Sequence, residues 1–184
     1  MTGSFQLDSN DSLATRALAC SNLQQPFLNG TEILTFSAQP YSQYVASPFF
    51  EPFIAQLGGV TTANVSYCNV TMTYTHPNQN DAINLQIWLP DNWNGRFQGT
   101  GGSGWRGGIF DLALVPAIVG GYAAASTDAG HSIVDSGTST WALSSPGNVD
   151  FVPLKNFGSI ALNELAVFGK AVTAQFYEKE ASYS

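Results

Sequence analysis

A glycine-rich stretch near the middle of the chain has the residue types that bring backbone amides close to a bound group. Residues 95–108 read GRFQGTGGSGWRGG, and Gly99 to Gly104 match the G-x-G-x-x-G pattern of dinucleotide-binding loops. Because glycine has no Cβ, such a loop can adopt positive φ and present N–H groups without steric hindrance. Three kinds of chemistry could use this loop.

Dinucleotide binding is the first of them. The sequence predicts a short strand before the glycines and a helix over 110–118, and Asp128 ends the next predicted strand, where a carboxylate could bind a ribose. Two features oppose this interpretation. A Trp-Arg-Gly-Gly segment follows where the helix should begin, and the indole of Trp105 would occupy the place of the pyrophosphate. A nucleotide-dependent oxidoreductase is therefore only a lesser alternative.

Nucleophilic catalysis by Ser103 is the second possibility. The nucleophile elbow of serine hydrolases has the pattern G-x-S-x-G, because its strained turn leaves no room for Cβ atoms. Trp105 stands where the second glycine belongs, and the only candidate bases are His76 and His131, the two histidines of the chain. The pattern thus fits a catalytic serine poorly.

The third possibility is a loop that binds an oxyanion. In α/β-hydrolases, one donor to the anionic tetrahedral intermediate is a backbone N–H from the connection that follows the third strand. We expect the amides of Gly101 and Gly102 to have this role, with Ser103 and Trp105 as possible substrate-pocket residues.

His131 closes the segment GYAAASTDAGH, which predicts a buried strand over 121–128. Ligands of α/β sheets bind at the carboxyl ends of strands, so His131 could line the substrate pocket. The alternative is a hydrogen-bonded structural pair of His131 and Asp128 that positions the loop. One carboxylate and one imidazole are too few ligands for zinc, so we predict no metal site and no cofactor in this chain.

The elements that must position these residues follow from hydrophobic periodicity. Alternation over 65–75 and 83–89 predicts an antiparallel hairpin, and a long helix with one apolar stripe is predicted from about residue 154. Strands that alternate with helices after a hairpin indicate an α/β fold with an antiparallel edge. Residues 1–64 are expected to form a covering segment of loops and short helices, including one over 49–59, and residues 65–184 to form the α/β unit.

Composition limits the partners. The 184 residues carry 6 Lys and Arg against 13 Asp and Glu, a net charge of −7, and only 10% are charged. Nucleic acids and anionic membranes bind through a surplus of cations, so we expect neither as a partner. No apolar run approaches the 18 residues of a membrane span.

Other features bear on the cellular compartment. Cys20 and Cys68 could be two free thiols or a disulfide that closes a loop and stabilises the fold by about 4 kcal/mol. Four N-x-[ST] glycosylation sequons favour export, although the polar N-terminus has no apolar leader segment; the sequons are at Asn10, Asn29, Asn64 and Asn69.

Several blocks together resemble the N-terminal part of the fungal tannase and feruloyl esterase family. They include NVTMTYTHPNQNDAINLQIWLPDNWNGRFQGTGGSGW, GYAAASTDAGH, LAVFGKAV and FYEKEASYS, in order over roughly residues 65–184. The resemblance implies an α/β-hydrolase fold, secretion, glycosylation and hydrolysis of phenolic esters. It also implies that Cys20 and Cys68 form a disulfide.

The resemblance further implies what lies outside this chain. Family members continue into a strand with a C-S-x-G-G nucleophile elbow and then a lid that binds calcium, so the serine, acid and base are expected beyond Ser184. On this interpretation the sheet is incomplete, and the chain is a truncated and inactive fragment of a serine esterase. A non-catalytic binding fragment is the main alternative.

Overall fold

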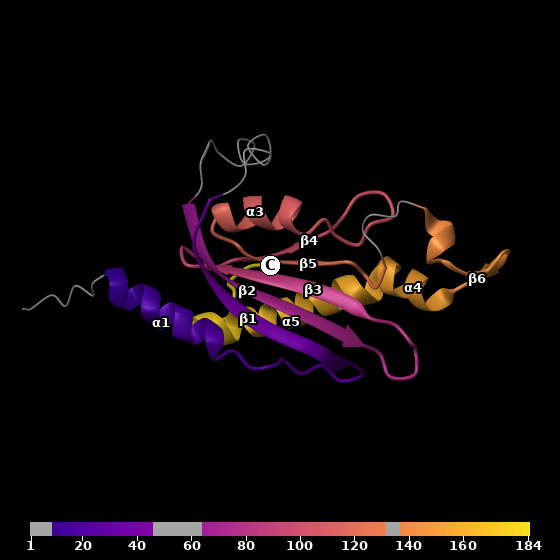
Figure 1. Ribbon diagram of the computed structural model, residues 1–184, viewed down its shortest axis with the longest axis horizontal. Coiled ribbons are helices and arrows are strands. Elements are labelled where there is room, and N and C mark those ends of the chain that lie inside the picture. The colour runs from indigo at the N-terminus through magenta and orange to yellow at the C-terminus, as the bar shows by residue number, and fades with distance from the viewer. Residues whose placement is uncertain (1–8, 46–63, 132–136) are drawn as a thin grey trace, which may run out of the picture.

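A five-stranded mixed sheet, with helices on both faces, organises the chain in the computed structural model (Figure 1). The structure describes residues 9–45, 64–131 and 137–184. The strand order is β1-β2-β3-β5-β4, and β6 and β7 form a separate two-stranded hairpin. The elements are α1 (Ser9–Ser21), β1 (Glu32–Val45), β2 (Asn64–Thr75), β3 (Ile83–Pro90), β4 (Phe97–Thr100), α3 (Asp111–Val119), β5 (Ala123–Thr127), η2 (Thr138–Thr140), β6 (Leu143–Ser145), β7 (Asn148–Val149), α4 (Phe151–Lys155), the π-helix η3 (Asn156–Ile160) and α5 (Ala161–Tyr177).

The predicted hairpin is confirmed by β2 and β3, which pair antiparallel from Tyr67 with Pro90 to Tyr74 with Ile83. Alternate residues of β2 point to opposite faces, as the period of two requires. Val70, Met72 and Tyr74 are buried on one face. The sequence periodicity therefore selects the register, because a one-residue slip would expose all of these side chains.

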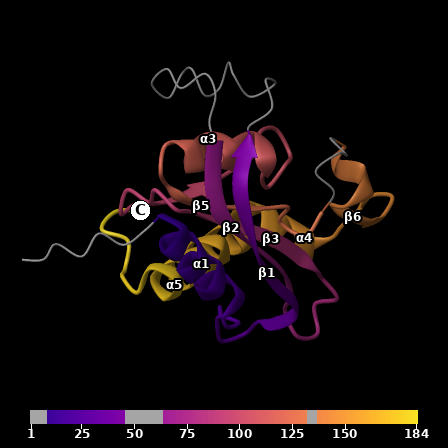
Figure 2. The same ribbon diagram turned by 60° about the vertical axis from the view of Figure 1, so that its left-hand side comes forward.

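Helices cover the two faces of the sheet unequally. Figures 1 and 2 show α3 on one face, and α1 and α5 on the other. Leu114 and Ile118 of α3 are completely buried, in a cluster with Trp88 of β3. The predicted apolar stripe of the long helix is confirmed on the other face of the sheet. Phe157 and Phe176 pack at its margins and are partly buried. The buried central members are Ala161, Leu165, Phe168 and Val172.

The N-terminal segment differs from the expectation of loops and short helices. Residues Glu32–Val45 form a strand of 14 residues that pairs antiparallel with β2, so the expectation is wrong for this part. Pro40 does not interrupt the strand because β1 lies at the edge of the sheet, where a missing N–H is tolerated. The helix expected over 49–59 lies outside the described residues.

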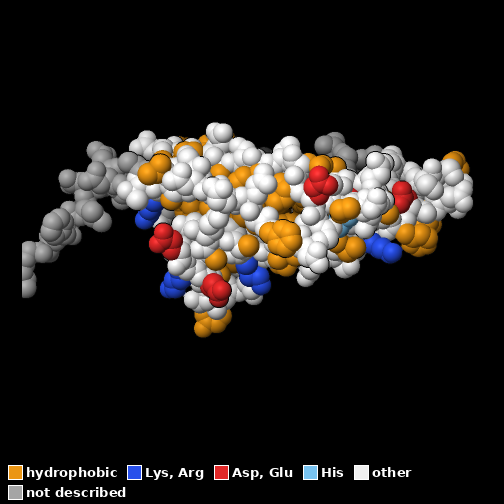
Figure 3. Space-filling model, turned by 90° about the horizontal axis from the view of Figure 1, so that it is seen from below, with side chains coloured by type: hydrophobic (Ala, Val, Ile, Leu, Met, Phe, Trp, Pro, Cys, Tyr) orange, Lys and Arg blue, Asp and Glu red, His pale blue; other side chains and the backbone are white. Residues whose placement is uncertain are grey.

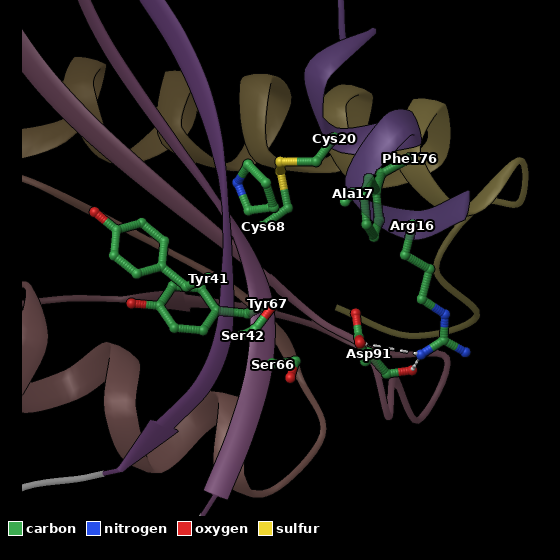
Figure 4. Close-up of a pocket in the computed structure, with 11 residues that line it drawn as sticks. Arg16, Ala17, Cys20, Tyr41, Ser42, Ser66, Tyr67, Cys68, Asp91 and Phe176 are labelled. Carbon is green, nitrogen blue, oxygen red and sulfur yellow. Dashed lines mark hydrogen bonds and ion pairs between the residues drawn. A yellow bond between two sulfur atoms is a disulfide. The ribbon is translucent and has the colours of Figure 1, made fainter. Parts of the chain in front are cut away.

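The predicted disulfide between Cys20 and Cys68 is confirmed, with a Cα–Cα distance of 5.6 Å. It ties α1 to β2, and Figure 4 shows the two sulfur atoms between the helix and the strand. Beside it, the Arg16 guanidinium donates a hydrogen bond to the carbonyl of Asp91 at 2.8 Å and lies 3.5 Å from its carboxylate. A polar helix that buries little apolar surface thus remains attached to the sheet by a covalent bond and one ion pair.

The surface agrees with the low charge of the sequence. On the face in Figure 3, charged side chains are few, and most of the area consists of apolar and uncharged polar atoms. Within the described part of the chain, no helix is both long and apolar enough to cross a membrane.

A buried charged cluster joins the hairpin to the C-terminal helix. The His76 ring lies between two carboxylates, with Nδ1 2.6 Å from Asp81 Oδ2 and Nε2 2.9 Å from Glu164 Oε1. Asp81 also accepts hydrogen bonds from the hydroxyl of Thr75 and the side-chain amide of Asn156. The cluster therefore connects the end of β2, the β2–β3 turn, η3 and α5.

The pKa values of two groups in this cluster, His76 and Asp81, are shifted. Burial alone would lower the pKa of His76, but hydrogen bonds to Asp81 and Glu164, together with their charges, raise it above its ordinary value of 6.5. Burial alone would raise the pKa of Asp81, but its hydrogen bonds from His76, Asn156 and Thr75 lower it. The folded state thus favours a protonated imidazole beside an ionised Asp81.

We expect the free energy of unfolding to fall as the pH rises through the raised folded-state pKa of His76. The contribution of a group with a raised pKa is fully present below its unfolded pKa, near 6.5, and disappears above its folded pKa. Urea unfolding at several pH values from about 6 to 9 would measure this slope. The variant His76→Gln cannot titrate, so the same slope in this variant would contradict the assignment.

A close approach between α5 and β4 depends on Gly169. A Cβ at this position would overlap the ring of Phe97, whereas a Cβ at Gly158 would meet no atom within 4 Å. We expect Gly169→Ala to lower the free energy of unfolding by about 1–3 kcal/mol, although alanine is the better helix former. Gly158→Ala is the matched control and should be neutral or stabilising. Equal effects of both variants in urea unfolding would refute the packing argument.

Candidate functional site

The glycine-rich loop leaves the sheet at the carboxyl end of β4, beside the carboxyl end of β5. These two strands are parallel, with Phe97 opposite Ala123 and Thr100 opposite Ser126. The hydroxyl of Thr100 donates to the carbonyl of Ala125 at 2.8 Å. Because the carboxyl ends of parallel strands meet at one edge, the turns after β4 and β5 are brought together there.

The base of the loop is packed directly on β5. A Cβ at Gly107 would overlap Ala129, and a Cβ at Gly108 would overlap Ser126. The amide of Phe110 donates to the hydroxyl of Ser126 at 3.2 Å. These two glycines are therefore required for the close packing of the loop on β5. This packing accounts for the Gly-Gly pair, which the dinucleotide-binding pattern does not include.

The tip of the loop is a closed turn. The amide of Arg106 donates to the carbonyl of Ser103 at 3.3 Å, and Gly104 has a φ of 62°. A Cβ at Gly102 would overlap the carbonyl of Arg106, so the two ends of the turn are in contact. The turn therefore holds Gly102 in a place that a larger residue could not occupy.

The amides of Gly101 and Gly102 are available to a ligand. Both residues are exposed, and within residues 9–45, 64–131 and 137–184 neither amide donates a hydrogen bond. Exposed N–H groups without a protein acceptor can donate to an anion, so these two amides are the candidate anion donors of the loop.

The turn after β5 is organised by Asp128. Its carboxylate accepts hydrogen bonds from the amide and side chain of Asn84, at 2.9 and 2.6 Å, and from the amide of Gly130 at 2.8 Å. These bonds hold Ala129 at a φ of 57°. The expected hydrogen-bonded pair of Asp128 and His131 exists only through the backbone, where the amide of His131 donates to the carbonyl of Asp128 at 3.3 Å. The side chains do not pair, because the carboxylate binds the donors above and the imidazole binds another group.

His131 instead contacts the glycine-rich loop. Its Nε2 lies 2.7 Å from the carbonyl oxygen of Trp105. The ring stacks on Trp141 with centroids 4.0 Å apart and meets Phe157 edge-on at 5.6 Å. His131 is 6% exposed, whereas Trp105 is 49% exposed and lies 5.7 Å from Phe157. The aromatic cluster of Trp105, His131, Trp141 and Phe157 thus supports the loop from beneath.

A cavity of about 350 Å³ lies on the other side of Gly101, between β4 and α5. None of the predicted pocket residues Ser103, Trp105 and His131 lines it. Tyr183 continues this edge by pairing in parallel with Arg96, and its carbonyl accepts a hydrogen bond from Phe97 at 3.0 Å. The residues that line the cavity are Phe97, Gly99, Thr100, Gly101, Leu162, Leu165, Ala166 and Ser184.

The other uses of the loop find little support in this geometry. Helix α3 begins only at Asp111, an acidic residue in its first turn that would repel a pyrophosphate. Neither histidine bonds to Ser103. Nε2 of His131 binds the carbonyl of Trp105, its Nδ1 is buried without a partner among the described residues, and both ring nitrogens of His76 bind carboxylates. Among the described residues, no group of three or more His, Cys, Asp or Glu side chains could hold a metal ion.

Sequence reasoning missed Trp141 and Phe157 as part of this site. The sequence places Phe157 only in the apolar stripe of the long helix. Trp141 follows the short 3₁₀-helix η2 and belongs to no recognisable motif. Their short-range signal is weak, since aromatic residues occur throughout cores. Only the fold brings both beneath the loop.

The predicted glycosylation sites differ in exposure. Asn29 and Asn64 are exposed, whereas the side-chain oxygen of Asn69 is buried within β2. Nothing is described of the side chain of Asn10. Glycosylation stays a prediction at all four positions.

Comparisons with known proteins identify similar chains. A family model described as tannase and feruloyl esterase matches residues 68–184. A probable feruloyl esterase from Arthroderma benhamiae is 40% identical over 167 residues, which cover 90% of this chain and 30% of that protein. A tannase from Aspergillus oryzae is 32% identical over 157 residues, which cover 81% of this chain and 24% of that protein.

Solved structures give the same result. The tannin acyl hydrolase from Aspergillus niger superposes with a TM-score of 0.72 at 27% identity, over 94% of this chain and 32% of that one. Feruloyl esterase B from Aspergillus oryzae superposes with a TM-score of 0.64, and its 22% identity supports the fold alone. The chain thus spans between about a quarter and a third of the length of these relatives, and its sheet corresponds to part of their α/β-hydrolase fold.

Proposed function

Because the chain belongs to the tannase and feruloyl esterase family, we propose that it supplies the oxyanion-binding loop of a secreted serine hydrolase that acts on phenolic esters. The observation that carries this proposal is the pair of exposed, unpaired amides at Gly101 and Gly102. They follow β4 at the sheet edge where the C-terminal residues begin to pair in parallel.

The proposed role is electrostatic. Attack of a serine hydroxyl on an ester carbonyl forms a tetrahedral intermediate whose oxygen carries the negative charge. The N–H of Gly101 or Gly102 would donate to that oxygen, and the second donor would be the amide that follows the serine. The loop is already anchored by its contacts with β5, so little reorganisation is needed during the reaction.

We place the remaining catalytic groups beyond Ser184, since the relatives are about three times as long as the matched region. The serine would take up the acyl group and a histidine would accept its proton. We assign calcium to a lid outside these residues, and no step here uses it. The half-exposed indole of Trp105 offers a flat surface beside the loop on which a phenolic ring could stack.

Secretion is supported by two observations. The Cys20–Cys68 disulfide forms readily only in an oxidising compartment, and the sequon residues Asn29 and Asn64 are accessible. A non-catalytic binding fragment is the second candidate function, favoured by the absence of a serine–histidine contact among the described residues.

We expect the 184-residue chain alone to hydrolyse neither methyl ferulate nor methyl gallate above a buffer blank, because it contains only one part of the acyl-transfer machinery. Product release followed by chromatography would measure this. Turnover would reveal a nucleophile within the chain. A titration with NAD(P)H monitored by fluorescence serves as the control for the dinucleotide interpretation, which saturable binding would support.

The oxyanion assignment can be measured in a chimera that replaces the matched segment of the Arthroderma benhamiae protein with this chain. We expect Gly101→Pro, which removes one N–H, to lower kcat on methyl ferulate by about 100- to 1000-fold if that amide is the donor. Gly102→Ala, which displaces the Arg106 carbonyl, should also lower kcat. Gly158→Ala is the control, because this residue is exposed and a Cβ there would meet no atom within 4 Å. If both loop variants kept full kcat, the loop would have no role in catalysis.

A further inference from the structure

We propose that His131 is a positioning residue for the oxyanion loop, which it holds through a hydrogen bond from its Nε2–H to the carbonyl of Trp105. The inference rests on the proposed function for its catalytic meaning, but the structural role can be measured by itself. It assigns separate tasks to the two ring nitrogens and explains why a histidine occupies a site without a carboxylate partner.

The identity of the acceptor determines the tautomer. A carbonyl oxygen can only accept, so the Nε2 atom 2.7 Å from the Trp105 oxygen must carry a proton. Nδ1 is buried and has no hydrogen-bond partner among the described residues. The imidazole therefore acts as a donor toward the loop, and this bond leaves Nε2 unable to act as a general base.

The ring itself is held rigidly. Trp141 stacks on one face of the imidazole at an interplanar angle of 16°, and Phe157 packs edge-on against it. The backbone before it is fixed by three hydrogen bonds to Asp128, and the amide of His131 donates to the Asp128 carbonyl at 3.3 Å. A donor that is fixed in this way can restrain a loop that is otherwise exposed.

The restraint reaches the anion-binding amides through the closed turn. The carbonyl of Trp105 belongs to the same peptide unit as the amide of Arg106, which donates to Ser103. The next carbonyl, that of Arg106, lies against Gly102. Because the peptide bond is planar, holding its oxygen also fixes the direction of its N–H, and the position of Gly102 follows.

Three variants separate the donor from the ring. Glutamine can place an amide N–H where Nε2 lies, asparagine offers an N–H only near the Nδ1 position, and phenylalanine keeps the stacking without a donor. We expect backbone order parameters of Gly101 to Arg106, measured by ¹⁵N relaxation on the full chain, near 0.85 in the parent and in His131→Gln. They should fall below about 0.6 in His131→Asn and His131→Phe.

The outcomes are decisive in either direction. A loop that stays equally ordered in His131→Phe, or that loses its order equally in a folded His131→Gln, would overturn the proposal. If the variants do not fold, the ring nitrogens of the parent still test the proposal, since long-range ¹H–¹⁵N spectra must show a proton on Nε2. An imidazole protonated only at Nδ1 would overturn it.

The test also separates this proposal from the enzymatic one. Loop order is measured without a substrate, so dependence of that order on the Nε2 donor supports the positioning role even if the chimera with the Arthroderma benhamiae protein is inactive. An active chimera whose loop order is indifferent to His131 would instead retain the proposed function and exclude this role.

Discussion

The parallel pairing of β4 with β5 is the constraint on which the site depends. It sets the carboxyl ends of both strands at one edge, so that the turn from Asp128 to His131 lies against the loop that follows Thr100. An antiparallel pair would separate these two turns by the length of a strand. Gly107 and Gly108 then allow the backbone of the loop to pack directly against β5 and the turn that follows it.

The same region shows how polar groups are used to hold backbone rather than to perform chemistry. Asp128 satisfies three N–H donors of β3 and its own turn, and His131 satisfies a loop carbonyl. Each bond replaces one to water and so contributes a modest free energy, but each fixes a direction. The amides of Gly101 and Gly102, in contrast, are exposed and donate no hydrogen bond within the described residues, so they remain the candidate donors to a ligand.

Sequence periodicity predicted those elements in which one face is buried. The β2–β3 hairpin and the stripe of α5 are examples, because burial imposes periods of two and 3.6. It failed for β1, an edge strand with only a few half-buried side chains and a proline in its middle. It did not locate α1 among the short helices expected in this segment, because Cys20 and Arg16 attach this helix to the sheet.

The site was predictable to the same extent. The glycines identified the loop, because their conformational freedom can be inferred from the residue type alone. The partner of His131 could not be predicted, because it is a main-chain carbonyl, which every residue has. Nearness in sequence favours a pair of Asp128 and His131, but the backbone turn directs the two side chains to different donors and acceptors.

The buried contact between His76 and Glu164 has a consequence for folding. The two residues are 88 positions apart, and each is desolvated by elements that must already be in place. Closing so long a segment costs chain entropy before the ion pair returns any attraction. The pair is therefore a long-range contact, of the kind that slows folding more than contacts within one helix do.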